Sequence, residues 1–258
     1  ISSGAVLNFN PSGGTGNYTG IISGDGSLIK SLPQSATTNV NTILSGTNTY
    51  TGGTQIYGGT LTIGDGSTKG SIIGNVNISQ NANLNFNRSD NTTFAGNISG
   101  AGSVNNIGGS LTLSGTNTYT GGTTIDSTNN AGNQAQITGS TSSIQGNISL
   151  IGNNSSLSIN QSSNGTFGGS ISGTGNVTVN SPNSTINFTN PLAFGSNFQG
   201  NFQVTNGTTV NFTSNIYSSG ASINIIPNNN ATCYGCGIKP TFNITCLLYT
   251  SDAADDTP

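Results

Sequence analysis

One ten-residue phrase occurs twice in this chain, and it constrains the fold more than any other feature. The phrase Ser-Gly-Thr-Asn-Thr-Tyr-Thr-Gly-Gly-Thr covers residues 45–54 and again residues 114–123, 69 positions later. On both sides of the phrase, apolar residues alternate with polar ones, a pattern typical of strands that bury one face. An identical copy at this distance indicates a repeat protein, in which each unit folds against its neighbours.

A longer unit surrounds the phrase. The segment Leu-Asn-Phe-Asn at 7–10 returns at 84–87 and, loosened, at 157–160. An aromatic-Gly turn and an Ile-Ser-Gly-x-Gly element follow each time, within residues 18–28, 94–104 and 167–177. In the third unit a degenerate segment, 194–200, takes the place of the phrase. Three units of about 73 residues therefore cover residues 1–210.

A unit of this length is too long for one coil of a solenoid and divides into about three coils of short strands and Gly/Asn turns. Each strand has one apolar face, such as Val6 with Phe9, that only stacked coils can bury. Asn and Thr at equivalent positions would form hydrogen-bonded ladders, and rings such as Tyr50 and Tyr119 could stack likewise. We predict an all-β fold, a parallel β-helix. The alternative, a β-sandwich, does not explain the repeat length.

Composition supports a thin core and excludes several classes of protein. Of the 258 residues 39 are Gly, 31% are hydrophobic, and only 4% are charged, against roughly 25% in an average soluble domain. A net charge of −3 without clustered Lys or Arg gives no basis for binding nucleic acid. No apolar run reaches the length of a membrane-spanning helix. Ile1 opens in repeat-like sequence without a signal peptide, so we expect an interior piece of a longer protein.

The end of the chain differs from the repeats. Residues 211–245 are interpreted as degenerate last coils with a Cys pair, whereas residues 246–258 have Ala-Ala, clustered Asp, no Gly and no Asn. This last segment resembles the in-frame translation of a transposase adapter used in preparing sequencing libraries, and such segments are excluded from fold reasoning. On that interpretation Cys246 is not native. The alternative is a genuine acidic C-terminus.

The phrase at 45–54 and 114–123 resembles the passenger-associated β-strand repeat of bacterial autotransporters, and the Ile-Ser-Gly-x-Gly elements at 98–102 and 171–175 fit the same pattern. The motif positions with an expected structural role are Ser45, Gly46, Asn48, Tyr50, Gly52, Gly53, Ser114, Gly115, Asn117, Tyr119, Gly121 and Gly122. The resemblance implies a right-handed parallel β-helical passenger at the cell surface or secreted. It also implies a C-terminal outer-membrane β-barrel, which this sequence lacks.

Cys233 and Cys236 form a C-x-x-C pair with three possible roles. A zinc site needs two more ligands, but the chain has no His and no second such pair. A redox pair needs a βαβ setting, which the repeats do not provide. In an exported protein, the expectation that follows from the resemblance, we favour a small loop disulfide. Such a pair near the end of a passenger is also similar to the vacuolating-cytotoxin branch of autotransporters.

The sequence predicts no catalytic residue, no cofactor and no metal site. Without His or Glu, a Ser-His-Asp triad cannot form. The acids of the repeats are Asp25, Asp65, Asp90 and Asp126. A glycosidase-type carboxylate pair would require two of them to stack on adjacent coils. Calcium-binding turns need an Asp in every repeat, but Ala101 and Thr174 stand where Asp25 stands in the first unit.

We therefore predict a fragment of an autotransporter passenger, a non-enzymatic stalk or adhesin-like scaffold whose partner is an unidentified host or surface ligand. The alternative is a toxin-like passenger of the vacuolating-cytotoxin kind, in which the β-helix mediates receptor binding and oligomerisation. A hydrophobic, Gly-rich segment upstream would favour the toxin. A second alternative, a β-helical polysaccharide-degrading enzyme, would require acids clustered on one face.

Overall fold

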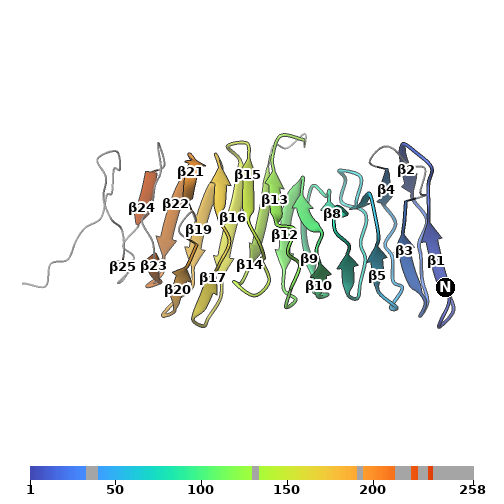
Figure 1. Ribbon diagram of the computed structural model, residues 1–258, viewed down its shortest axis with the longest axis horizontal. Coiled ribbons are helices and arrows are strands. Elements are labelled where there is room, and N and C mark those ends of the chain that lie inside the picture. The colour runs from blue at the N-terminus through green and yellow to red at the C-terminus, as the bar shows by residue number, and fades with distance from the viewer. Residues whose placement is uncertain (33–39, 130–133, 191–193, 213–221, 226–231, 235–258) are drawn as a thin grey trace, which may run out of the picture.

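The computed structural model describes residues 1–32, 40–129, 134–190, 194–212, 222–225 and 232–234. Within these ranges, twenty-five short strands stack along one long axis, and together they make a β-solenoid of about nine turns (Figure 1). Every strand pairing among these residues is parallel. The prediction of an all-β parallel solenoid is confirmed. In the same part of the chain no helix has the length and apolar character needed to cross a membrane.

The strands form four sheets, numbered here 1 to 4. Sheet 1 consists of β1 (Val6–Phe9), β3 (Ser27–Lys30), β5 (Thr54–Ile56), β7 (Val76–Ile78) and β10 (Ile98–Gly100). Sheet 2 consists of β2 (Thr15–Tyr18), β4 (Asn41–Leu44), β6 (Thr60–Ile63), β8 (Asn83–Phe86), β11 (Ser103–Asn106), β13 (Thr123–Asp126), β15 (Ile148–Ile151), β18 (Ile171–Gly173) and β21 (Phe194–Phe198).

Sheets 3 and 4 lie toward the C-terminal end. Sheet 3 consists of β9 (Asn91–Phe94), β12 (Gly109–Leu113), β14 (Ala135–Gly139), β16 (Ser155–Asn160), β19 (Asn176–Asn180), β22 (Asn201–Thr205) and β24 (Ser222–Ile225). Sheet 4 consists of β17 (Gly165–Phe167), β20 (Thr185–Phe188), β23 (Thr209–Phe212) and β25 (Thr232–Tyr234).

The register between strands gives the length of one coil, because residues that lie opposite each other occupy the same place in adjacent coils. Val76 lies opposite Ile98, and Leu111 lies opposite Ile137. The second of these coils is slightly longer than the first. Three coils lead from Thr54 through Val76 and Ile98 to Thr118, so the second copy of the phrase extends beyond three coils and ends in sheet 2, whereas the first ends in sheet 1.

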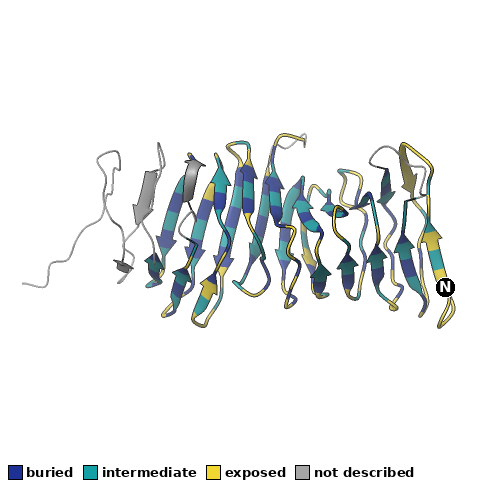
Figure 2. Cartoon of the chain, in the orientation of Figure 1, coloured by how far each residue is buried: buried dark blue, intermediate teal, exposed yellow. Residues whose placement is uncertain are grey.

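Buried residues alternate with less buried ones along many of the strands (Figure 2), and the buried apolar residues form one narrow core. Leu28, Val104 and Ile137 have no exposed surface, and burial of each such side chain is worth roughly 1.5–3 kcal/mol. In β1, Leu7 and Phe9 are the residues that pack against the core, whereas Val6 is 52% exposed. The predicted pairing of Val6 with Phe9 on one face is wrong, because residues three apart in a strand point to opposite faces.

Asn and Thr side chains form the predicted ladders between neighbouring coils. The amide of Asn105 donates to Asn85 at 2.8 Å, and the amide of Asn211 donates to Asn187 at 2.9 Å. These contacts pair polar groups that the parallel register places directly opposite each other. They hold neighbouring coils together without any charged side chain.

Lys30 places an amine inside the core. It occupies an apolar column, opposite Phe9 on one side and Ile56 on the other, and has no exposed surface. Its Nζ donates to the carbonyl oxygens of Ser31 at 2.8 Å and Gly58 at 3.3 Å. Burial lowers the pKa of the Lys30 amine below its ordinary value of 10.5, because the charged form loses hydration.

We expect the stability of the wild-type protein to rise with pH relative to that of Lys30→Met. Between the lowered pKa of the native state and the ordinary pKa, the unfolded chain binds a proton that the native chain does not. The wild type therefore gains up to about 1.4 kcal/mol per pH unit in that window. Urea unfolding of both proteins at several pH values from 7 to 10, followed by circular dichroism, measures the difference. Parallel stability profiles would contradict a lowered pKa.

Candidate functional site

The asparagine of the repeated phrase connects three successive coils. Asn117 is 3% exposed, and its Oδ1 accepts the backbone N–H of Ile98 from the preceding coil at 2.7 Å. Its Nδ2 donates at 2.5 Å to the carbonyl of Ser143 in the following coil. Its backbone N–H donates at 2.9 Å to Ser142, also in the following coil. One buried side chain thus satisfies backbone groups that lie outside regular strand pairing.

The first copy of the phrase repeats this geometry. Asn48 is 1% exposed, accepts the N–H of Ile22 at 2.9 Å and donates to Ser71 at 3.0 Å. It also donates to the carbonyl of Gly46 in its own coil at 3.0 Å. Because the contacts recur in both copies, they belong to the motif and not to one local loop.

The tyrosine of the phrase points inward and pairs with the last threonine of the phrase. The hydroxyl of Tyr50 lies 2.6 Å from Thr54 Oγ1, and that of Tyr119 lies 2.7 Å from Thr123 Oγ1. Burial raises the pKa of Tyr50 to about 12 and also raises the pKa of Tyr119. Since the unfolded phenols ionise near pH 10, folding stability falls as the pH rises from there toward 12.

The two rings do not stack on each other as the sequence suggested. The coil of Tyr119 lies on the coil of Gly100, and the coil of Tyr50 lies on that of Gly24. Gly100 lies opposite Ile78, and Ile78 lies opposite Ile56, so more than one coil separates the two rings. Each tyrosine is held by its own threonine instead.

Tyr119→Phe is expected to cost more stability than Tyr50→Phe. Both changes remove the bond to the threonine hydroxyl, worth about 1 kcal/mol. Tyr119 also accepts the backbone N–H of Gln145 at 3.2 Å, so its loss leaves a second group unpaired and raises the cost to about 2 kcal/mol. Urea unfolding of the two variants gives the comparison. Equal costs would show that the Gln145 contact contributes nothing.

The glycines of the phrase are required by the close approach of coils. A Cβ on Gly115 would lie 2.3 Å from the carbonyl oxygen of Gly96, and one on Gly121 would lie 2.5 Å from Gly102. Gly122 has a φ of +92°, a value that side-chain-bearing residues rarely adopt. Gly46, Gly52 and Gly53 occupy the matching positions of the first copy, with the same kinds of backbone contact and, at Gly53, a φ of +80°.

The serine that opens the phrase differs between the copies. Ser45 is 5% exposed, and its hydroxyl donates to Asn17 at 2.9 Å. Ser114 is exposed, and its backbone N–H donates to Phe94 at 3.1 Å. The serine therefore has a side-chain contact between coils only in the first copy.

The degenerate third segment keeps the backbone geometry and changes the side chains. Gln199 N–H donates to Gly173 at 2.8 Å, as Thr51 does to Gly24 and Thr120 to Gly100 at 2.9 Å. Phe198, with no exposed surface, thus stands where the tyrosine stands in the earlier copies. Four residues on, Phe202 replaces the threonine and packs at 5.7 Å against Phe188. An apolar pair has replaced the hydrogen-bonded pair.

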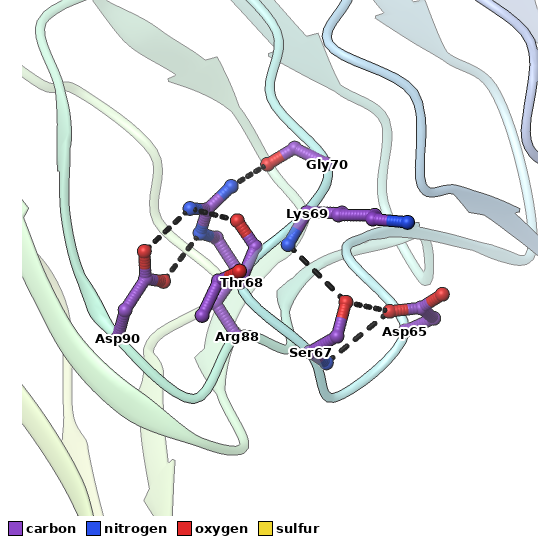
Figure 3. Close-up of polar contacts among 7 residues, drawn as sticks. All are labelled: Asp65, Ser67, Thr68, Lys69, Gly70, Arg88 and Asp90. Carbon is purple, nitrogen blue, oxygen red and sulfur yellow. Dashed lines mark hydrogen bonds and ion pairs between the residues drawn. The ribbon is translucent and has the colours of Figure 1, made fainter.

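Asp65 and Asp90 lie at the two ends of one group of polar contacts, Asp90 at Arg88 and Asp65 at Ser67 (Figure 3). Arg88 binds Asp90 through Nε at 2.8 Å and Nη2 at 2.7 Å, and its hydrogen bond lowers the pKa of the Asp90 carboxyl. Asp65 accepts the hydroxyl of Ser67 at 2.6 Å, and this bond lowers the pKa of Asp65. Both carboxylates are ionised at neutral pH, so neither can serve as the proton donor of a glycosidase pair.

The other acids stand apart from this pair. Asp25 accepts the hydroxyl of Thr51 at 3.1 Å, and Asp126 accepts the N–H and hydroxyl of Thr128. Among the described residues no group of three or more His, Cys, Asp or Glu side chains could hold a metal ion. Cys233 lies in β25 opposite Val210, but its side chain and Cys236 lie outside the described residues.

A family model described as the passenger-associated-transport-repeat matches residues 41–63 and 108–127. These segments contain both copies of the phrase in full, including both inward asparagines. These two segments identify the repeated phrase as part of the passenger-associated-transport-repeat of autotransporters. With its β-solenoid fold, the chain forms an autotransporter passenger scaffold. No curated protein and no solved structure gives a significant match.

Most of the side-chain contacts between coils were not predicted from the sequence. The phrase alternates buried Gly46, Asn48 and Tyr50 with exposed Thr47 and Thr49. This period of two was a signal that the asparagine points inward. By contrast, Arg88 contacts a loop of the preceding coil, and the residues next to Arg88 in the sequence do not predict these contacts.

Proposed function

We propose that this passenger segment is a stiff stalk with few charged residues that displays or forms an adhesive surface outside a bacterial cell. One observation carries the proposal. The two segments that match the family model also contain the buried asparagines that bond to neighbouring coils. A solenoid clamped across successive coils resists bending and local opening. The family context favours the cell surface or the secreted fraction of a bacterium as its location.

We further propose that the segment has no catalytic role. Asp65 and Asp90 are occupied by hydrogen bonds and have lowered pKa values. The strands expose Asn, Thr and Ser rather than acids or bases. These features favour binding to an uncharged surface through hydrogen bonds over catalysis of a reaction.

Display on a bacterium tests the proposal. The segment, carrying an epitope near the exposed Tyr57, is expressed between an export signal and the translocating part of an autotransporter. We expect antibody to label intact cells, and labelled cells to attach to host-cell or abiotic surfaces more strongly than cells that display the translocating part alone. Labelled cells that attach no better than this control would contradict the adhesive role. Failure to reach the surface would contradict the passenger role.

A further inference from the structure

The described part of the chain offers very few targets to a protease that cuts after Lys or Arg. Its Lys and Arg residues are Lys30, Lys69 and Arg88. Lys30 has no exposed surface, and the side chain of Arg88 is only 14% exposed. Lys69 is exposed, in the loop between β6 and β7. Within these residues, the Lys69–Gly70 bond is therefore the one accessible site for such an enzyme.

Arg88 holds the backbone on both sides of Lys69 (Figure 3). Its Nη2 donates to the carbonyl of Thr68 at 2.5 Å, and its Nη1 donates to the carbonyl of Gly70. The two-pronged ion pair with Asp90 fixes the guanidinium in this position. Charge-assisted bonds of this kind are about twice as strong as neutral ones. The side chain of Lys69 runs away from the ion pair in the same view.

The loop is also tied from the other side. Asp65 accepts the N–H and hydroxyl of Ser67, and Ser67 Oγ accepts the N–H of Lys69 at 3.2 Å. Gly70 is buried, with so little room that a Cβ there would lie 2.5 Å from the nitrogen of Gly64. A protease must draw several residues into an extended strand, so this loop has to open before it can be cut.

We propose that Lys69–Gly70 is a cleavage site for a trypsin-class serine protease, and that the Arg88–Asp90 pair limits cleavage by holding the carbonyls of Thr68 and Gly70. Cleavage is hydrolysis: one water is consumed, a carboxylate forms on Lys69 and an amine forms on Gly70. The two fragments stay associated, because β5 pairs with β7 and β6 pairs with β8 across the cut. The site is independent of the adhesive role proposed above.

Timed digestion of the full chain with trypsin tests the site, with Lys239→Gln present in every protein so that this lysine outside the described residues does not compete. We expect slow release of a fragment that begins at Gly70, identified by mass, and no such cut in Lys69→Gln. Asp90→Asn removes the charge that anchors Arg88 and should speed the cut about tenfold or more, because opening of the loop becomes less costly. After cleavage the fragments should co-elute in size-exclusion chromatography.

The matched control is Asp126→Asn, which removes a comparable turn carboxylate bonded to Thr128 and Asn129 in another loop. Its cut at Gly70 should proceed at the wild-type rate, and circular dichroism should show all variants folded. Equal rates for Asp90→Asn and wild type would overturn the role of the ion pair. A first cut after Lys30, or continued cutting of Lys69→Gln at this loop, would overturn the site itself.

Discussion

Asn117→Ala is expected to lower the free energy of unfolding by about 3 kcal/mol. The substitution removes the side-chain partners of Ile98 N–H and Ser143 C=O, both covered by neighbouring coils. A buried polar group left without a partner costs roughly 1–3 kcal/mol, and here there are two such groups. The effect should concentrate at the junction of three coils, because each side-chain bond joins a different neighbour.

Urea unfolding and amide hydrogen exchange measure this loss. Exchange at Ile98 should accelerate in the variant, since its N–H no longer has an acceptor, whereas exchange in β19 and β22 should change little. Thr118→Ala is the matched control: Thr118 is the next residue, is exposed, and should cost no more than about 0.5 kcal/mol. If Asn117→Ala lowered the free energy of unfolding no more than the control, the Asn117 side chain would not hold the neighbouring coils together.

The sequence was sufficient to predict the fold, because the spacing of its repeated motifs indicates a solenoid. An identical phrase at a distance of 69 residues indicates a repeat, and short strands with one apolar face must stack to bury it. The glycines were predicted as turn residues, whereas their close approach to the backbone of the neighbouring coil is seen only in the structure.

The side chains that join coils were less predictable, because their partners lie a full coil away. Asn48 reads locally as a turn residue, yet it binds Ile22 and Ser71 on two different coils. Arg88 and Asp90 are two positions apart, but the loop whose carbonyls Arg88 binds is 18 or more residues upstream. Such contacts depend on coil lengths, which vary from one coil to the next.

The third unit shows which parts of the motif the fold needs. Phe198 and Phe202 take the place of the Tyr–Thr pair. Both pairs can be buried, because the hydroxyls of tyrosine and threonine bond to each other and the phenylalanines have no polar group. The glycine two positions later cannot be exchanged as easily: a Cβ on Gly200 would lie 1.7 Å from the carbonyl oxygen of Gly175. Backbone proximity is thus retained between units while side-chain chemistry changes.

Gly100→Ala should be among the most damaging single-methyl changes in the described chain, with a loss of about 3 kcal/mol or more. Gly100 has a φ of +101°, and a Cβ there would lie 2.1 Å from the carbonyl oxygen of Ile78. Backbone strain of this kind costs about 1–3 kcal/mol, and the clash must in addition push β10 away from β7. Gly24 and Gly173 repeat the geometry, with φ values of +100° and +105°.

Gly168→Ala is the control that separates this clash from any general effect of replacing glycine. A Cβ on Gly168 meets only Thr189 Oγ1, at 3.8 Å, so the change should be neutral or stabilise by about 0.4–1 kcal/mol through the unfolded chain. Urea unfolding ranks the two variants, and hydrogen exchange at Thr120, whose N–H donates to Gly100, locates the damage. If the two variants unfolded at the same urea concentration, the coil spacing would be able to absorb a methyl group. The Ile-Ser-Gly-x-Gly element would then need another explanation than close backbone contact.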